Sequence, residues 1–149
     1  MNKNLVTSVL IFLGSMLALT ACDESDVPLS AAPRYGNMVF NPTMATPGDS
    51  VTVTVEQAKK GVSLESTDYT WRISYGFESE EGDAKDTIVV LHQHTNYDAA
   101  GQADPSVRFL VPNNCSSRFV SVSLLGEFSG YSGPTLFFQA TKTGTLSVR

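Results

Sequence analysis

The sequence has few basic residues. Its 149 residues include ten Lys and Arg against fifteen Asp and Glu, and no basic cluster is larger than Lys59-Lys60. A protein that binds nucleic acid needs a basic patch to neutralise the phosphates. The charge balance therefore argues against a nucleic-acid partner.

The sequence also lacks an apolar run long enough to cross a bilayer. The longest uncharged apolar run, Leu5 to Leu19, has fifteen residues, whereas a membrane-spanning helix needs about 20. Lys3 precedes the run and small residues follow it. This pattern is typical of a secretory signal peptide.

The apolar run ends in Leu19-Thr20-Ala21-Cys22, which resembles the lipobox of bacterial lipoproteins. The resemblance implies that residues 1–21 are removed as a lipoprotein signal peptide and that Cys22 is lipidated on its thiol and its new amine. Two or more acyl chains anchor a protein firmly, because each buried methylene contributes about 0.8 kcal/mol. We therefore expect a membrane anchor at Cys22. The alternative is an ordinary signal peptide that is cut elsewhere, with Cys22 incidental.

Acidic residues follow Cys22 directly, as Asp23, Glu24 and Asp26, with Ser25 between them. This stretch is similar to the acidic export signal of Bacteroidetes lipoproteins, which directs them to the outer face of the outer membrane. The resemblance implies display on the cell surface. The alternative is a solvated tether whose charges keep it extended.

The mature chain is expected to contain one domain. Residues 22–36 comprise the lipidated cysteine and a Pro-containing flexible tether, and residues 37–149 form the domain. Without Lys3, nine basic and fifteen acidic residues leave a net charge of −6. With Cys22 lipidated, Cys115 has no partner for an intrachain disulfide, so the domain must rely on packing. We expect Cys115, in a turn-rich stretch, to have no chemical role.

The domain shows a period of two throughout, and no sustained helical period. Strict alternation of apolar and polar residues predicts half-buried β-strands. About seven short strands separated by turns predict an all-β, antiparallel sandwich. Only "EQAKKGVSLES" is compatible with one helical turn, and the C-terminal segment predicts one long strand or two short ones meeting near Thr143-Gly144. The residues expected to face inward are Val51, Val53, Val55, Tyr69, Trp71, Ile73, Tyr75, Phe77, Val107, Phe109, Val111, Val120, Val122 and Leu124.

A Pro-Gly-Asp turn, an alternating Val/Thr strand and a Trp-bearing strand follow one another in "NPTMATPGDSVTVTV" and "YTWRISY". This order is similar to bacterial immunoglobulin-like modules, including the fibronectin type III and PKD-like groups. The resemblance covers most of residues 37–149 and implies an immunoglobulin-like sandwich. Modules of this kind are usually spacers, adhesive domains or carbohydrate-associated domains, and they are usually not catalytic.

His92 and His94 are the two histidines of the sequence. Residues two apart on a strand project from the same face about 6–7 Å apart, which suits two ligands of one metal ion. Asn96 and Asp98 share this parity if the strand continues. A zinc or copper site needs more ligands than this pair supplies, so the pair is only a weak metal candidate. The competing interpretation is a solvent-facing strand end.

Two further stretches have a superficial likeness to functional sites. The acidic "FESEEGDAKD" does not have the spacing of a calcium-binding loop and is expected to be a solvated hairpin loop. In "GEFSGYSGP", neither Ser129 nor Ser132 has glycines on both sides at the spacing of a nucleophile elbow. We therefore predict no catalytic residue.

Three aromatic residues are candidates for ligand binding: Tyr97, Phe128 and Tyr131. If all three lie on loops, they form an aromatic platform for a sugar ring or a protein. Burial in the core is the competing interpretation.

These observations predict a non-catalytic lipoprotein of the bacterial outer membrane, without a cofactor, that binds a protein or glycan through loops at one end of the sandwich. One alternative is a structural subunit of an envelope complex, joined by strand addition at a sheet edge. Another is a small metal-dependent enzyme that uses His92 and His94.

Overall fold

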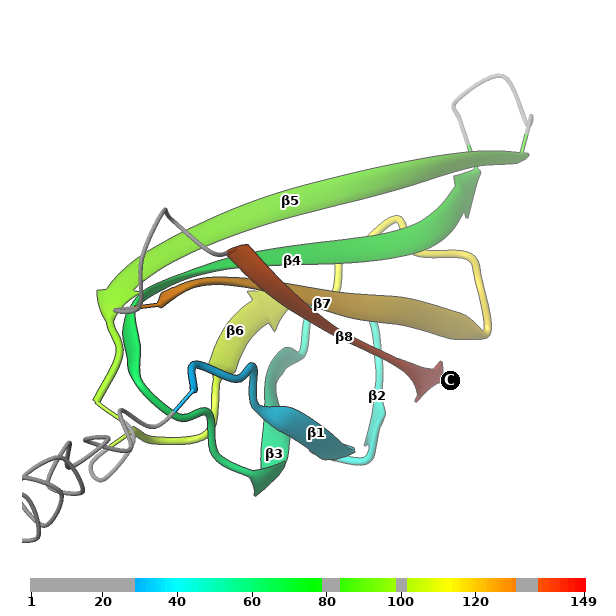
Figure 1. The fold of residues 1–149 in the computed structure, drawn as a ribbon. Helices are drawn as coiled ribbons and strands as arrows, with labels where there is room; N and C mark the ends of the chain where they lie inside the picture. The colour runs from blue at the N-terminus through cyan, green and yellow to red at the C-terminus, as the bar shows by residue number, and fades with distance from the viewer. Residues whose placement is uncertain (1–28, 79–83, 99–101, 131–136) are drawn as a thin grey trace, which may run out of the picture.

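Eight β-strands make up two packed sheets in the computed structural model, which describes residues 29–78, 84–98, 102–130 and 137–149 (Figure 1). The strands are β1 (Arg34–Asn41), β2 (Met44–Ala45), β3 (Ser50–Lys59), β4 (Leu64–Glu78), β5 (Ala84–Asn96), β6 (Ser106–Leu110), β7 (Phe119–Gly130) and β8 (Phe137–Val148).

The three-stranded sheet has the order β1-β3-β6, and the five-stranded sheet has the order β2-β8-β7-β4-β5. The chain crosses between the sheets from β1 to β2, from β2 to β3, from β3 to β4, from β5 to β6 and from β6 to β7. This arrangement confirms the predicted immunoglobulin-like sandwich. Two details differ from the prediction: the strands number eight, and the short β2 pairs with β8 in parallel.

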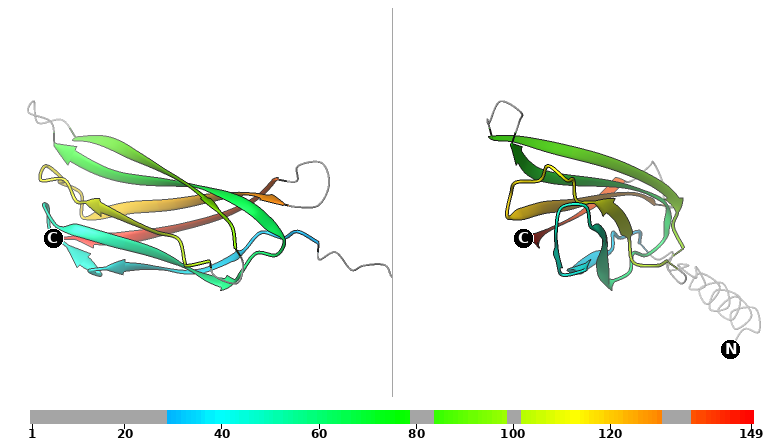
Figure 2. Two further views of the ribbon diagram at one scale, coloured as in Figure 1. Left: turned by 90° about the vertical axis from the view of Figure 1, so that its left-hand side faces the viewer. Right: turned by 180° about the vertical axis from the view of Figure 1, so that it is seen from behind.

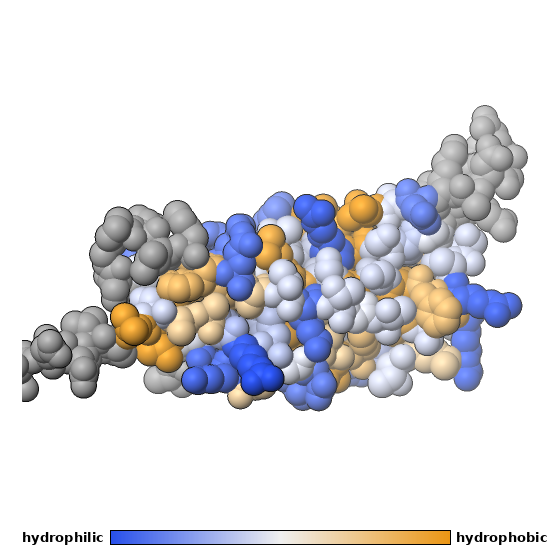
Figure 3. All heavy atoms as spheres, turned by 45° about the vertical axis from the view of Figure 1, so that its right-hand side comes forward, coloured by the Kyte–Doolittle hydropathy of each residue, from blue (hydrophilic) through white to orange (hydrophobic). Residues whose placement is uncertain are grey.

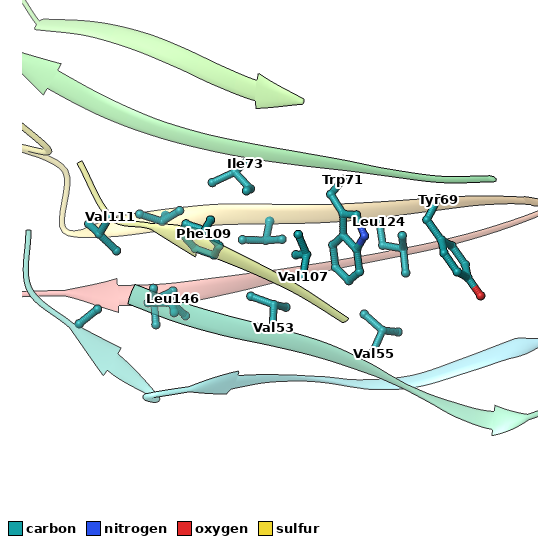
Figure 4. Packing of buried hydrophobic residues seen from close by; sticks show 14 of the residues in the cluster. Val53, Val55, Tyr69, Trp71, Ile73, Val107, Phe109, Val111, Leu124 and Leu146 are labelled. Atoms are coloured by element: carbon teal, nitrogen blue, oxygen red, sulfur yellow. The ribbon is translucent and has the colours of Figure 1, made fainter. Parts of the chain in front are cut away.

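The alternating residues form the core, as their parity predicts. Trp71 is fully buried and points from β4 toward Val53 and Val55 of the opposite sheet (Figure 4). The predicted inward residues of β3, β6 and β7 belong to the same buried cluster. Tyr75 is half-buried, because it lies near the end where the sheets no longer cover each other. The side chain of Phe77 lies outside the described residues.

Two boundary predictions need correction, and one open alternative is decided. Strand β3 runs on to Lys59, so the helical turn considered for this stretch does not form there. Strand β8 is one long strand through Gly144, where the missing side chain leaves room for Met38 of β1. Ordered structure begins before residue 37: β1 starts at Arg34, and Ala31 and Val62 exchange two backbone hydrogen bonds of 3.0 Å.

The Pro47-Gly48-Asp49 turn lies just before β3 and is held by hydrogen bonds of Asp49 and Gly48. The Asp49 carboxylate accepts one from the Thr46 backbone N–H at 2.8 Å and one from the Thr46 hydroxyl at 2.9 Å. These bonds lower the pKa of Asp49. Gly48 has a φ of 92°, a conformation that favours glycine, and its N–H donates to the Val111 carbonyl at 2.8 Å.

The β4–β5 hairpin is the longest feature of the sandwich (Figure 2). Its register runs from Ser66 opposite Asn96 to Glu78 opposite Ala84 with no shift. Strand β5 has β4 as its one neighbour and is therefore an edge of the five-stranded sheet. In the described ranges, no helix is long and apolar enough to cross a membrane.

Candidate functional site: the open edge at β5 and β6

The two histidines project from the outer face of the five-stranded sheet, opposite Thr70 and Asp68 of β4. The His92 Nδ1 lies 3.1 Å from the Thr70 hydroxyl, and the His94 Nδ1 lies 2.6 Å from an Asp68 carboxylate oxygen. Each ring thus has a neighbour on the adjacent strand. Strand β5 ends at Asn96. In the part of the chain that the structure describes, no group of three or more His, Cys, Asp and Glu is arranged to hold a metal ion.

The prediction that Tyr97 and Phe128 form an exposed loop platform is wrong. Tyr97 is 4% exposed and Phe128 is fully buried, with their ring centroids 5.9 Å apart at an edge-to-face angle of 90°. The Tyr97 hydroxyl accepts a hydrogen bond from the Gly61 N–H at 2.6 Å and donates one to Gln57 at 3.2 Å. Burial raises the pKa of Tyr97. Tyr131 lies outside the described residues.

Phe128 is buried because the alternation of β7 continues beyond Leu124, where the predicted inward set ended. The strand continues to Gly130, so the inward parity of Val120, Val122 and Leu124 carries on to Phe128. Gly126, between them, gives the ring its space: a Cβ there would lie 2.4 Å from the Tyr35 hydroxyl and 2.8 Å from the Phe128 ring. Extending the parity of the predicted strand would have found this burial in the sequence.

The remaining predicted positions are either buried or outside the described residues. Cys115 is a free, buried thiol whose Sγ lies 3.5 Å from the Ser117 hydroxyl. Cys22 and the loop carboxylates Glu80, Glu81 and Asp83 lie outside the described residues.

The edge strand β5 exposes three consecutive apolar side chains. Ile88 is 59% exposed, Val89 40% and Val90 43%. Ile88 and Val90 lie on the outer face, opposite Ser74 and Arg72, while Val89 lies on the inner face opposite Ile73. Apolar residues also reach the surface in several areas of the face shown in Figure 3. An edge strand with unpaired backbone groups and apolar side chains is a template for another strand.

An apolar recess of about 250 Å³ opens beside this edge, between β5 and β6. Beside it, Gln93 of β5 connects the two sheets: its Nε2 donates to the Ser106 carbonyl of β6 at 3.4 Å, and its Oε1 accepts a hydrogen bond from the Trp71 indole N–H of its own sheet at 3.1 Å. Beyond this bridge, the short β6 ends at Leu110 while β5 continues. The recess is lined by Ile73, Tyr75, Val89, Leu91, Arg108, Phe109, Leu110 and Pro112.

The outer face of the five-stranded sheet has a different character. Its shallow depression of about 360 Å³ is lined mainly by hydroxyl side chains and Arg72. A smaller depression of about 160 Å³ contains Asp68 and Glu127, which lie opposite each other on β4 and β7. Both lie over β4, β7 and β8, whereas the recess adjoins the edge of β5, where exposed apolar side chains and unpaired backbone occur together.

The sequence contained a signal for this edge that pattern analysis missed. Ile88, Val89, Val90 and Leu91 are consecutive apolar residues, so they break the alternation of a strand with one buried face. A strand of this kind is apolar on both faces. The sequence does not show whether a second strand covers it.

Comparisons with known proteins give no family for the chain. No family model matches it, and no curated protein matches it. Among solved structures, it is similar to the sporulation control protein Spo0M from Bacillus subtilis, with a TM-score of 0.41 and 13% sequence identity. The match covers 79% of this chain and 49% of that chain, so this chain spans about half the length of Spo0M.

Proposed function

We propose that the protein is a non-catalytic lipoprotein of the bacterial outer membrane, displayed on the cell surface, that binds a protein partner by strand addition at β5. One observation carries the proposal: β5 is a long sheet edge with three exposed apolar residues, next to an apolar recess. In strand addition, the main chain of the edge supplies hydrogen bonds and adjacent pockets take alternate side chains of the partner.

The chemistry of this edge favours a protein over a glycan. An extended peptide offers both the backbone groups that pair with β5 and the apolar side chains that fill the recess. A sugar ring needs exposed aromatic faces and polar partners, and both described members of the predicted aromatic platform are buried. The proposal therefore joins the lipoprotein with the strand-addition alternative.

The membrane anchor is supported by the sequence around Cys22 and is tested by Cys22→Ser. We expect the wild-type protein to sediment with outer membranes and the variant to remain unprocessed and lose its acyl chains, because serine offers no thiol for the lipid. Membrane fractionation and the mass of the N-terminal peptide measure both effects.

The buried Cys115 provides the matched control, since Cys115→Ser should leave processing and sedimentation unchanged. The anchor is wrong if the Cys22→Ser variant sediments with membranes as the wild type does and neither form carries lipid. Protease treatment of intact cells tests display, because a chain that is cut only after lysis faces inward.

The edge is tested by placing a photo-crosslinking amino acid at Ile88 in intact cells. We expect one crosslinked species of defined mass, because the side chain at 88 lies beside an added strand. The substitution Val90→Lys should abolish it, since lysine on an edge strand opposes pairing. The matched control is Thr143, an exposed position of the same sheet on β8. Equal crosslinking from both positions, or none from Ile88, would contradict binding at this edge.

A further inference from the structure

We propose that the partner at the edge is a second copy of this chain, with β5 pairing antiparallel to β5 about a two-fold axis. This inference rests on the proposed strand addition and names its occupant. Pairing of this kind joins two five-stranded sheets into one and places the same surface of both copies in the interface.

The backbone of β5 is suited to such pairing. Its ladder with β4 has no bulge or register shift over its length, so its free edge is regular. Natural proteins block exposed edges with proline, with lysine or with bulges. Between Asp86 and Asn96, β5 contains neither proline nor lysine. Lys85 stands at the start of the strand, so these devices are missing along the apolar stretch itself.

The side chains of β5 in one copy complement those of β5 in the second copy when the two-fold axis passes at Val89. This register places Val90 opposite Ile88 of the second copy, so apolar residues meet on the outer face. It also places Asp86 opposite His92 of the second copy. Cross-strand pairs of both kinds stabilise a sheet. The strand has its carboxylate before the apolar stretch and its imidazoles after it, which only an antiparallel arrangement brings together.

Contacts of the two histidines within one copy favour an axis at Val89 over an axis at Val90. An axis at Val90 would place Asp86 opposite His94, which already lies 2.6 Å from Asp68 of its own chain. His92 has a weaker neighbour, the Thr70 hydroxyl at 3.1 Å, and can face the carboxylate of the second copy. In the Val89 register, Val89, which lines the recess of its own copy, lies opposite Val89 of the second copy on the inner face.

Both copies can be anchored in one membrane. The bridge between Ala31 and Val62 and the contact of Gly61 with Tyr97 put the start of the domain near the Asn96 end of β5. The two-fold axis sends these ends in opposite directions. Eight residues separate Cys22 from Ala31, a reach of about 26–29 Å. The dimer therefore lies with its strands along the membrane, and each spacer reaches down from one end.

A cysteine scan of β5 tests the arrangement in the full chain. Single cysteines at each position from 87 to 91 are introduced with Cys115→Ser, expressed in the native cell, oxidised and separated without reductant. Directly opposed residues in antiparallel strands have Cα atoms about 4.5–5.5 Å apart, within the range of a disulfide. At positions 87 and 91, which are two residues from the axis, the Cα atoms of the same residue in the two copies are about 14 Å apart. We expect disulfide dimers to peak at 89 and to be several-fold fewer at 87 and 91.

A charge exchange provides a second test in the Val89→Cys background. Asp86→Lys should lower the dimer yield several-fold because the carboxylate that faces His92 of the second copy is replaced by a second basic group. Adding His92→Asp should restore the yield, because the opposed charges are exchanged. Dimers at no position, or equal yields at all five, would overturn self-pairing. If Ile88 then crosslinks to a different protein, strand addition stands and the second copy is wrong; if it crosslinks to nothing, both fail.

Discussion

Replacing Trp71 with alanine is expected to lower the free energy of unfolding by about 3–5 kcal/mol. Trp71 is fully buried between the sheets, and its loss leaves the largest cavity that one substitution in this core can make. The substitution also removes the N–H that donates to Gln93. Gln93 is the residue of β5 whose side chain bonds to Ser106 of β6. Urea unfolding followed by circular dichroism measures the change.

Two variants make the Trp71 result specific. Trp71→Phe keeps much of the volume but removes the donor, so its loss should be smaller than that of alanine. Leu110→Ala removes an apolar side chain that is 59% exposed and should change the stability by no more than about 0.5 kcal/mol. If Trp71→Ala were as mild as Leu110→Ala, the side chain would not be at the centre of the core.

Replacing Phe128 with alanine is expected to cost about 3–5 kcal/mol of stability. Its ring is fully buried and meets the rings of Tyr69 and Tyr97 edge-to-face at 6.2 and 5.9 Å. Edge-to-face pairs contribute beyond the buried area itself. A surface platform residue would instead be replaced with little effect on unfolding, so the variant distinguishes core from platform.

Phe119, on the same strand as Phe128, is the matched control. It is 58% exposed, and Phe119→Ala should change stability by no more than about 0.5 kcal/mol. Both variants delete the same atoms from β7, so a difference between them measures burial. Equal losses in thermal and urea unfolding would contradict the placement of Phe128.

The strands themselves could be predicted from the sequence because their pattern is local. In β3, β6 and β7, one face packs in the core and the other meets solvent, so apolar and polar residues alternate. The burial of Val53, Val107 and Val122 follows directly. Phe128 was missed because the set of inward residues was ended at Leu124, although the same alternation continues to Phe128. The anchor at Cys22 is also a local pattern, and it stays a prediction.

The sheet order could not be predicted in the same way, because it depends on residues far apart in the chain. Tyr97 is buried because its hydroxyl meets Gln57 and Gly61, and no spacing in the sequence indicates that contact. The parallel pairing of β2 with β8 joins the two ends of the domain.

The candidate site shows the same division most clearly. The sequence by itself determined that Ile88 to Leu91 form an apolar strand, since β-branched residues favour extended backbone. Only the tertiary structure decided that this strand is an edge, because each strand of a sheet has two sides and the long-range pairing of the other strands left one side of β5 unpaired.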